Sequence, residues 1–355
     1  MNVSFYPGPS QLYPEVEHYL TDAYRSGILS MNHRSAAFMD LLAQTVAALS
    51  EKLALPAEYE IYFTSSATEC WEIIAQSLIG HRSLHAFNGA FGQKWYEYTR
   101  RLFPDCVAQP FGVDEPLDVA GIASVEQADV LCLTHNETSN ATAISSELLL
   151  ASRHAFAGLI AVDATSSMAG VALPWEAADV WFASVQKCFG LPPGLGVLIV
   201  SPRAVEQAQR VADHRHYNSL LFVRENFLKN QTPYTPNTLA IYLLYRVMQQ
   251  VSPIRQIDVQ TRQRAQAWYA LLEKLPVAPL VGNEAVRSPT VVAFRGEGLF
   301  IGKLKERALI EGIVLGNGYG EWKNTSVRIA NFPAITDEDI HRLRVFLQNN
   351  ILKFL

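Results

Sequence analysis

Short apolar runs alternate with amphipathic helical patterns between about residue 60 and residue 200. The apolar runs, which we expect to be strands, lie at 61–64, 84–87, 129–134, 159–163, 180–184 and 196–200. Helical patterns lie between the first four runs, at 69–78, 93–103 and 147–156. Buried strands that alternate with helices are typical of a mostly parallel sheet covered on both faces. Ligands of such sheets bind at the carboxyl ends of strands, so functional residues are expected just after each strand.

The pattern changes near residue 250. Two long helices are expected at about 237–251 and 255–275, followed by a segment rich in Pro and Gly. A strand, a helix, a second strand and a final helix come after it, which predicts a smaller α/β domain. We therefore expect a large domain over residues 16–252 and a small domain made of residues 1–15 and 253–355.

Composition excludes several classes of function. The 355 residues are 49% hydrophobic and 18% charged, with a net charge of -5, so nothing attracts the chain to nucleic acid or to an anionic membrane. We see no membrane-spanning apolar run and no signal-peptide pattern. The four cysteines have no metal-ligand spacing, which predicts no metal site and suits a reducing compartment. We expect a cytoplasmic protein.

Small and polar residues follow the predicted strands. TSSATE (64–69) opens a helix, where backbone N–H groups and hydroxyls can bind an anion or simply cap the helix. NGAFG (88–92) places Phe91 between glycines that let a ligand approach, although the ring could instead fill the core. HNETSNA (135–141) could bind a ligand or form a solvated loop.

Lys187 lies between two of the predicted strands. Apart from the thiol of Cys188, it is the only ionisable side chain from Val180 to Val200. Burial of a lone ammonium lowers its pKa and makes it a nucleophilic amine. A neutral amine forms an imine with an aldehyde, which is how pyridoxal phosphate is held in enzymes. The alternative is a lysine that extends its charge to the surface.

Four features that pyridoxal phosphate needs occur in chain order. Ala67 and Thr68 would form a phosphate cup, Phe91 would stack on the ring, Asp163 would bind the pyridine nitrogen, and Lys187 would supply the amine. Asp163 ends an apolar run, where a buried carboxylate must be paired unless it caps the next segment. The combination predicts a pyridoxal phosphate site with Lys187 and Asp163 as its catalytic residues.

The sequence resembles the class V aminotransferases of pyridoxal phosphate fold type I, and among them the phosphoserine aminotransferase group. Besides the segments above, the similarity includes FYPGPSQLYPEV (5–16), MNHRSAAFMDL (31–41), SVQK (184–187), TPYTPNT (232–238) and VRIANFPAI (327–335). The resemblance covers essentially the whole chain. It implies an α/β fold in which a large domain holds a mostly parallel seven-stranded sheet between helices, with a smaller C-terminal α/β domain.

The resemblance implies a role for each matching residue. Lys187 would hold the cofactor covalently, and Asp163 would keep its pyridine nitrogen protonated. Thr235 would reach the cofactor of a neighbouring subunit, which implies a homodimer with its site at the subunit interface. The remaining cofactor contacts would come from Ala67, Thr68 and Gln186 to the phosphate, Phe91 to the ring, and Thr138 to the 3-hydroxyl.

Three further matches would bind substrate. Arg328 would grip the substrate carboxylate, and His33 and Arg34 match a pair that contacts the acidic group of phosphoserine. Two expected phosphate-directed arginines are missing, because Glu69 lies in the cup and GYGEWKNTS (318–326) replaces a second His-Arg pair. Lys323 and the basic stretch at 213–217 could compensate, or that stretch could be a solvated helix end.

The implied reaction is a ping-pong transamination between a small amino acid and a 2-oxo acid, with phosphoserine and glutamate as the expected donors. Glu69 and Glu321 favour an alternative, a transaminase of the serine–pyruvate or alanine–glyoxylate type. A lyase or decarboxylase with the same cofactor, or a non-catalytic scaffold with this fold, also stays open. A cysteine desulfurase would need a cysteine after the lysine loop, and none follows Cys188.

Overall fold

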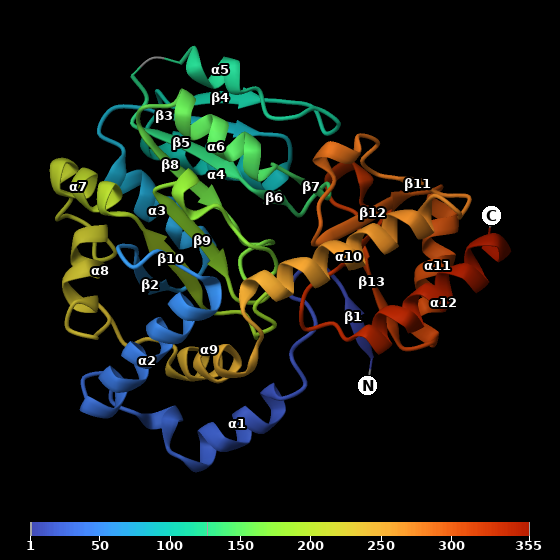
Figure 1. Ribbon diagram of the computed structural model, residues 1–355, viewed down its shortest axis with the longest axis horizontal. Helices are drawn as coiled ribbons and strands as arrows, with labels where there is room; N and C mark the ends of the chain where they lie inside the picture. The colour runs from blue at the N-terminus through green and yellow to red at the C-terminus, as the bar shows by residue number, and fades with distance from the viewer. Residues whose placement is uncertain (1, 126, 355) are drawn as a thin grey trace.

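The computed structural model describes residues 2–125 and 127–354 and contains a large seven-stranded sheet (Figure 1). Its strand order is β2-β10-β9-β8-β5-β3-β4. β10 runs antiparallel to β2 and β9, and the other pairs are parallel, which confirms the predicted sheet. The strands are β2 (Glu60–Thr64), β3 (Ser83–Phe87), β4 (Val107–Pro110), β5 (Val130–Thr134), β8 (Leu159–Asp163), β9 (Val180–Ser184) and β10 (Gly196–Val200).

Helices cover this sheet because the central strands are apolar on both faces. Every residue of β5, β8, β9 and β10 is buried. A serine hydroxyl caps the start of four of the helices, accepting a backbone N–H bond in each case. The helices are α3 (Ala67–Leu78), α4 (Ala90–Leu102), α5 (Val119–Ala123), α6 (Ser146–Ala155), α7 (Pro202–Val211) and α8 (Leu220–Phe227), with the 3-10 turn η2 (Trp175–Ala177).

A second sheet joins the two ends of the chain. Its order is β1-β13-β14-β12-β11, and β1 pairs parallel to β13. Its strands are β1 (Val3–Phe5), β11 (Ala278–Pro279), β12 (Val291–Arg295), β13 (Ile313–Asn317) and β14 (Ser326–Ala330). The helical elements around it are α10 (Ile254–Leu272), α11 (Gly298–Ile310), α12 (Asp337–Phe354), η3 (Glu284–Val286) and η4 (Gly320–Trp322), and both chain ends lie on this side of the molecule (Figure 1).

Helices α1 (Val16–Arg25), α2 (Ala36–Leu53) and α9 (Thr238–Gln250) lie together below the large sheet in Figure 1, with η1 (Ile28–Ser30) between the first two in sequence. The hydroxyl of Tyr19 on α1 donates a hydrogen bond to Gln250 on α9. Two short strands, β6 (Asn136–Glu137) and β7 (Thr142–Ala143), pair as a hairpin.

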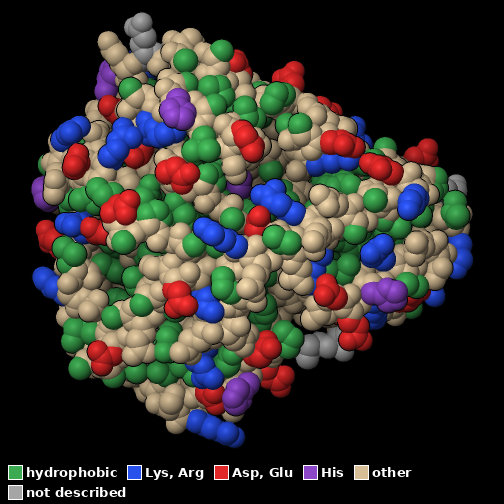
Figure 2. Space-filling model, viewed as in Figure 1, with side chains coloured by type: hydrophobic (Ala, Val, Ile, Leu, Met, Phe, Trp, Pro, Cys, Tyr) green, Lys and Arg blue, Asp and Glu red, His purple; other side chains and the backbone are tan. Residues whose placement is uncertain are grey.

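The distribution of charged side chains on the surface agrees with the small net charge. Lys, Arg, Asp and Glu side chains are mixed over the face seen in Figure 2. Within residues 2–125 and 127–354, no helix combines the length and apolar character that a bilayer crossing needs.

Candidate active site

A cavity of about 300 Å³ lies where the strands of the large sheet end. Because β10 is antiparallel to both of its neighbours, β2 has the same direction as β9, β8, β5 and β3. Their carboxyl ends therefore meet at one edge. The cavity is lined by Gly8, Pro9, Ala67, Thr68, Trp71, Phe91, Lys94, Tyr98, Thr134, Asn136, Thr138, Asp163, Thr165, Ser184, Gln186 and Lys187.

Seven of the residues singled out in the sequence lie around this cavity: Ala67, Thr68, Phe91, Thr138, Asp163, Gln186 and Lys187. Arg328 on β14 lies next to it, since its Nη1 donates to the carbonyl oxygen of Thr138 at 2.7 Å. His33, Arg34 and Thr235 do not line the cavity of their own chain. Arg34 and Thr235 are exposed, and Arg34 Nη1 donates to Gln231 Oε1 at 2.6 Å.

Lys187 is buried, with 8% of its surface exposed. Its Nζ donates to Thr138 Oγ1 at 2.8 Å and to Ser166 Oγ at 2.9 Å, and it lies 5.2 Å from the ring centre of Phe91. Burial lowers the pKa of this amine to about 8, while the charge of Asp163 opposes the shift. The amine is therefore available in its nucleophilic form near neutral pH.

Asp163 is the last residue of β8 and is 6% exposed. Burial raises the pKa of its carboxyl, and hydrogen bonds from Thr165 and the charge of Lys187 oppose that change. The Thr165 backbone N–H donates to Asp163 Oδ1 at 2.9 Å. The carboxylate thus lies at the cavity wall and caps the following turn, so the capping interpretation is confirmed.

The start of α3 forms one end of the cavity. Ser66 caps this helix by accepting the backbone N–H of Glu69 at 3.2 Å, and Ala67 N–H donates to Ser184 Oγ at 2.7 Å. The carboxylate of Glu69 turns back to accept the N–H and hydroxyl of Ser65 at 2.7 and 2.8 Å. Glu69 is therefore a capping residue outside the cavity lining, and its charge does not project into the cup.

The polar cluster at 135–140 is buried in full, so the solvated-loop interpretation is wrong. The reason is Glu137, a buried carboxylate that sequence reasoning left without a role. It accepts the backbone N–H groups of Phe91 and Gly92, each at 3.1 Å, and both donors of Ser139. A Cβ at Gly89 would lie 2.4 Å from Glu137 Cγ, so glycine is needed for this approach. Glu137 thus fixes the first turn of α4 and the ring of Phe91.

Among the described residues that line the cavity, four buried polar atoms have no hydrogen-bond partner: Trp71 Nε1, Thr134 Oγ1, Asn136 Nδ2 and Thr165 Oγ1. Buried polar groups are normally satisfied, so these atoms fit a polar ligand in the cavity. The N-terminal segment closes one side. A Cβ at Gly8, whose φ is +133°, would lie 2.9 Å from Lys187 Cε. Only a glycine leaves room for the lysine there.

Other residues that line the cavity or lie next to it were also missed from the sequence. Ser166 lies in the ATSS segment after β8, where its hydroxyl could have been suspected. Lys94 follows Phe91 by three positions on α4, and residues three apart share one helix face. That spacing was the available signal. Tyr319 comes from the second sheet's loops, and no pattern in the sequence connects it to this cavity.

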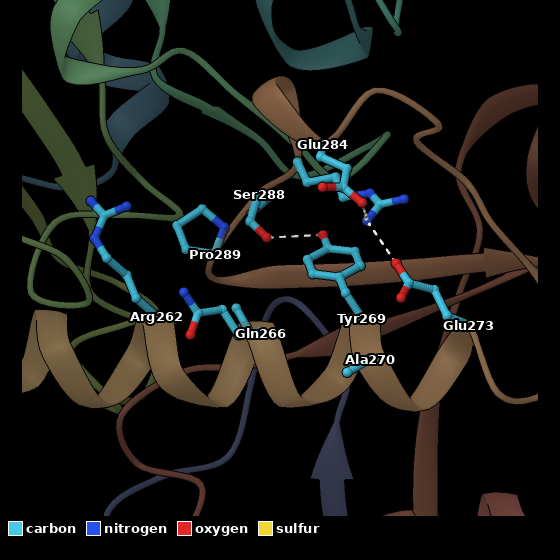
Figure 3. A pocket seen from close by; sticks show the side chains of 10 residues that line it. Arg262, Gln266, Tyr269, Ala270, Glu273, Glu284, Ser288 and Pro289 are labelled. Atoms are coloured by element: carbon cyan, nitrogen blue, oxygen red, sulfur yellow. Dashed lines mark hydrogen bonds and ion pairs between the residues drawn. The ribbon is translucent and has the colours of Figure 1, made fainter.

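A second cavity of about 480 Å³ lies between α10 and residues 284–289 (Figure 3). Its charged groups have ion-pair partners, since Arg287 pairs with Glu273 at 3.5 Å and Glu284 at 3.2 Å, and Arg262 pairs with Asp258 on α10. Tyr269 donates to the carbonyl of Ser288 at 3.0 Å, as Figure 3 shows. The chemistry is therefore assigned to the cavity around Lys187.

The chain is similar over most of its length to known proteins. The aminotransferase class-V family model matches residues 5–320. A phosphoserine aminotransferase from Rhodococcus opacus is 29% identical over 95% of this chain and 91% of its own. The crystal structure of a phosphoserine aminotransferase from Cytophaga hutchinsonii is 34% identical, covers 99% of both chains and superposes with a TM-score of 0.94.

The fold extends to more distant enzymes. An aspartate aminotransferase from Thermus thermophilus is 23% identical, with a TM-score of 0.87 over the full length of both chains. At that identity the likeness concerns the fold alone. The family match over most of the chain and the 34% identical structure are decisive. The chain belongs to the class-V aminotransferase family, whose members are pyridoxal-phosphate-dependent enzymes of fold type I.

Proposed function

We propose that this class-V aminotransferase binds pyridoxal 5′-phosphate and transfers the amino group of phosphoserine to 2-oxoglutarate, giving 3-phosphohydroxypyruvate and glutamate, or runs the reverse reaction. The observation that carries the proposal is the buried Lys187 amine, which lies in one cavity with Asp163, Phe91 and the helix start at Ala67. The choice of phosphoserine rests on the names of the relatives that are 29% and 34% identical.

The cavity fits this cofactor in size and chemistry. Ala67, Thr68 and Gln186 would bind its phosphate, because α3 begins at the cavity and the start of a helix attracts an anion. Asp163 would bind the pyridine nitrogen, and Thr138 would bind the 3-hydroxyl. The unpartnered polar atoms described above would gain partners. When bound, the cofactor supplies an aldehyde for amines and a ring that withdraws electrons from the substrate Cα.

Each residue of the chain would then have its own role in the reaction. Lys187 would attach the cofactor, give way to the substrate amine, and move the proton from the substrate Cα as a general base. Phe91 would keep the ring flat against one face of the site. Arg328 would hold the substrate carboxylate, so that the Cα–H bond faces Lys187. The same steps in reverse order would load the second substrate in a ping-pong cycle.

We further propose a homodimer with the site at the subunit interface. His33, Arg34 and Thr235 do not line the cavity of their own chain. Arg34 and Thr235 are exposed, as residues that complete a partner's cavity would be in a single chain. We place the reaction in serine biosynthesis and in the cytoplasm, in keeping with four cysteines that are all free.

A second candidate is a transaminase for a non-phosphorylated small amino acid. Glu321 and Trp322 line a neighbouring cavity of about 360 Å³ with Tyr319, where the phosphoserine aminotransferase group would place cations. The carboxylate of Glu321 is exposed there and would repel a phosphate. This observation favours serine or alanine as the donor.

Glutamate formation decides between the two. The purified holoprotein is incubated with 2-oxoglutarate and phosphoserine, serine or alanine, and glutamate is measured over time. The proposal expects phosphoserine to give a kcat/KM at least tenfold above the two neutral donors. Faster turnover of serine or alanine would transfer the assignment to the second candidate, and no turnover of any amino acid would contradict both.

A further inference from the structure

The proposed substrate carries a phosphate, and two of the arginines expected to bind it are missing. Glu69 and the GYGEWKNTS segment replace the basic residues of the phosphoserine aminotransferase group. The two substitutes considered from sequence lie elsewhere: Lys323 is exposed, and Arg215 is 86% exposed and faces Asp213 at 3.7 Å. Neither lines the cavity. In the dimer proposed above, His33 and Arg34 would reach the acidic group from the partner subunit, and the chain's own cavity holds a further cation.

Lys94 is such a cation. It lines the cavity from α4, one helical turn after Phe91, and its Nζ lies 5.7 Å from the centre of the Phe91 ring. Lys187 and Asp163 are the other charged residues of the lining, and both are committed to the cofactor. Among the described residues, no carboxylate lies within ion-pair distance of Lys94. Its charge is available to a ligand.

Tyr319 sets the position of that charge. Lys94 Nζ donates to the Tyr319 hydroxyl at 2.6 Å, and this hydrogen bond raises the pKa of Lys94, so the amine stays charged at neutral pH. The same ring lies 5.4 Å from Phe91 and 5.5 Å from the guanidinium carbon of Arg328. One tyrosine thus joins the aromatic face, the carboxylate-binding arginine and a second cation.

Lys94 and Arg328 both lie next to the Tyr319 ring, at 5.2 and 5.5 Å from its centre, and two cations match a substrate with two anionic groups. Arg328 is partly used, since its Nε and Nη1 donate to the carbonyls of Asn317 and Thr138 at 2.7 Å, and the rest of its fork is left for the α-carboxylate. We propose that Lys94, positioned by Tyr319, binds the acidic side-chain group of the substrate and sets the preference for acidic over neutral amino acids. The inference rests on the proposed function and names a specificity-determining residue for it.

The test compares substrates that differ only in the phosphate. Holoprotein with Lys94→Met is mixed with phosphoserine or serine, and conversion of the cofactor is followed by absorbance. We expect kcat/KM for phosphoserine to fall tenfold to about a hundredfold, the range of one lost charge-assisted hydrogen bond, while that for serine changes less than twofold. Lys94→Arg should keep most of the wild-type kcat/KM for phosphoserine. Tyr319→Phe should give a kcat/KM between those of wild type and Lys94→Met.

Binding without reaction gives an independent readout. The dissociation constants of 3-phosphoglycerate and glycerate are measured on holoprotein by calorimetry. Lys94→Met should weaken 3-phosphoglycerate tenfold or more and leave glycerate unchanged. Lys303→Met, which removes an exposed lysine on α11, is the matched control and should alter neither ligand.

The outcomes separate this inference from the proposed function. If wild-type protein converts phosphoserine and Lys94→Met keeps its ratio of phosphoserine to serine, Lys94 has no part in specificity and the inference is wrong. If wild-type protein converts glutamate but not phosphoserine, the phosphoserine assignment fails. The inference is then tested by whether Lys94→Met lowers the kcat/KM for glutamate more than that for alanine. If wild-type protein converts only neutral amino acids, both fail.

Discussion

Lys187 is the residue on which the proposed chemistry depends, and the sequence marks it well. It is the one amine in an apolar segment that lies between two strands, so burial and a lowered pKa follow from its neighbours. Its hydrogen bonds to Thr138 and Ser166 could not be predicted, because they depend on how the segments after β5 and β8 fold back over the sheet edge. Lys94 was missed because only its helical spacing from Phe91 points to it.

The pKa of Lys187 predicts how cofactor uptake depends on pH. Burial lowers that pKa to about 8, so the amine becomes neutral, and able to attack an aldehyde, two to three units below an ordinary lysine. The rate at which protein stripped of cofactor takes up pyridoxal phosphate should rise from pH 6.5 and level off above about pH 8.5. Stopped-flow absorbance measures it. A rate that still climbs about tenfold per pH unit between pH 8 and pH 9 would mean an ordinary lysine.

Helix α4 shows how an element is positioned for function. Its first turn has no side-chain cap of its own at Gly89, and Glu137 from the β6–β7 hairpin supplies the acceptor instead. The sequence predicted the helix but began it at residue 93, because the capping carboxylate is 45 residues away in the chain. Helices α1 and α2 and the short edge strand β4 had no prediction at all, and β4 is half-exposed with little apolar pattern.

Removing the Glu137 carboxylate should destabilise the start of helix α4. Glu137→Ala leaves the buried N–H groups of Phe91, Gly92 and Ser139 without their acceptor, so we expect the free energy of unfolding to fall by about 2–4 kcal/mol. Denaturant unfolding measures the change, and cofactor affinity should fall with it because Phe91 loses its anchor. Glu225→Ala, at an exposed position of α8, is the control and should stay within about 0.5 kcal/mol of wild type. Equal values for the two variants would show that Glu137 is not the anchor.

The arrangement of the two sheets explains which residues of the site can be predicted from a single sequence. The residues after β2, β3, β5, β8 and β9 converge because those strands run in one direction, and this convergence was predictable from the strand pattern. Contributions from the second sheet, such as Tyr319, depend on packing between sheets that no local pattern encodes. Contributions from a partner subunit, proposed for Arg34 and Thr235, rest on the family resemblance.

The proposed dimer predicts complementation between two inactive variants. Lys187→Ala lacks the amine and Arg34→Ala lacks the residue proposed to reach the partner's cavity, so each homodimer should be inactive or strongly impaired. Mixed dimers hold one intact site, and an equal mixture unfolded and refolded together should regain about a quarter of wild-type activity. Light scattering should give twice the chain mass of 39.5 kDa. No regain of activity by a mixture shown to be dimeric would place Arg34 outside the partner's site.

The most direct test of the central claim is to find the residue that holds the cofactor. Holoprotein is treated with sodium borohydride, which fixes a cofactor aldehyde to its amine, and is then digested and mapped by mass spectrometry. We predict the added mass on the peptide that contains Lys187 and no label in Lys187→Ala prepared in the same way. Label on another lysine, or an unlabelled Lys187 peptide from protein that retains the cofactor, would contradict the assignment of this cavity as the active site.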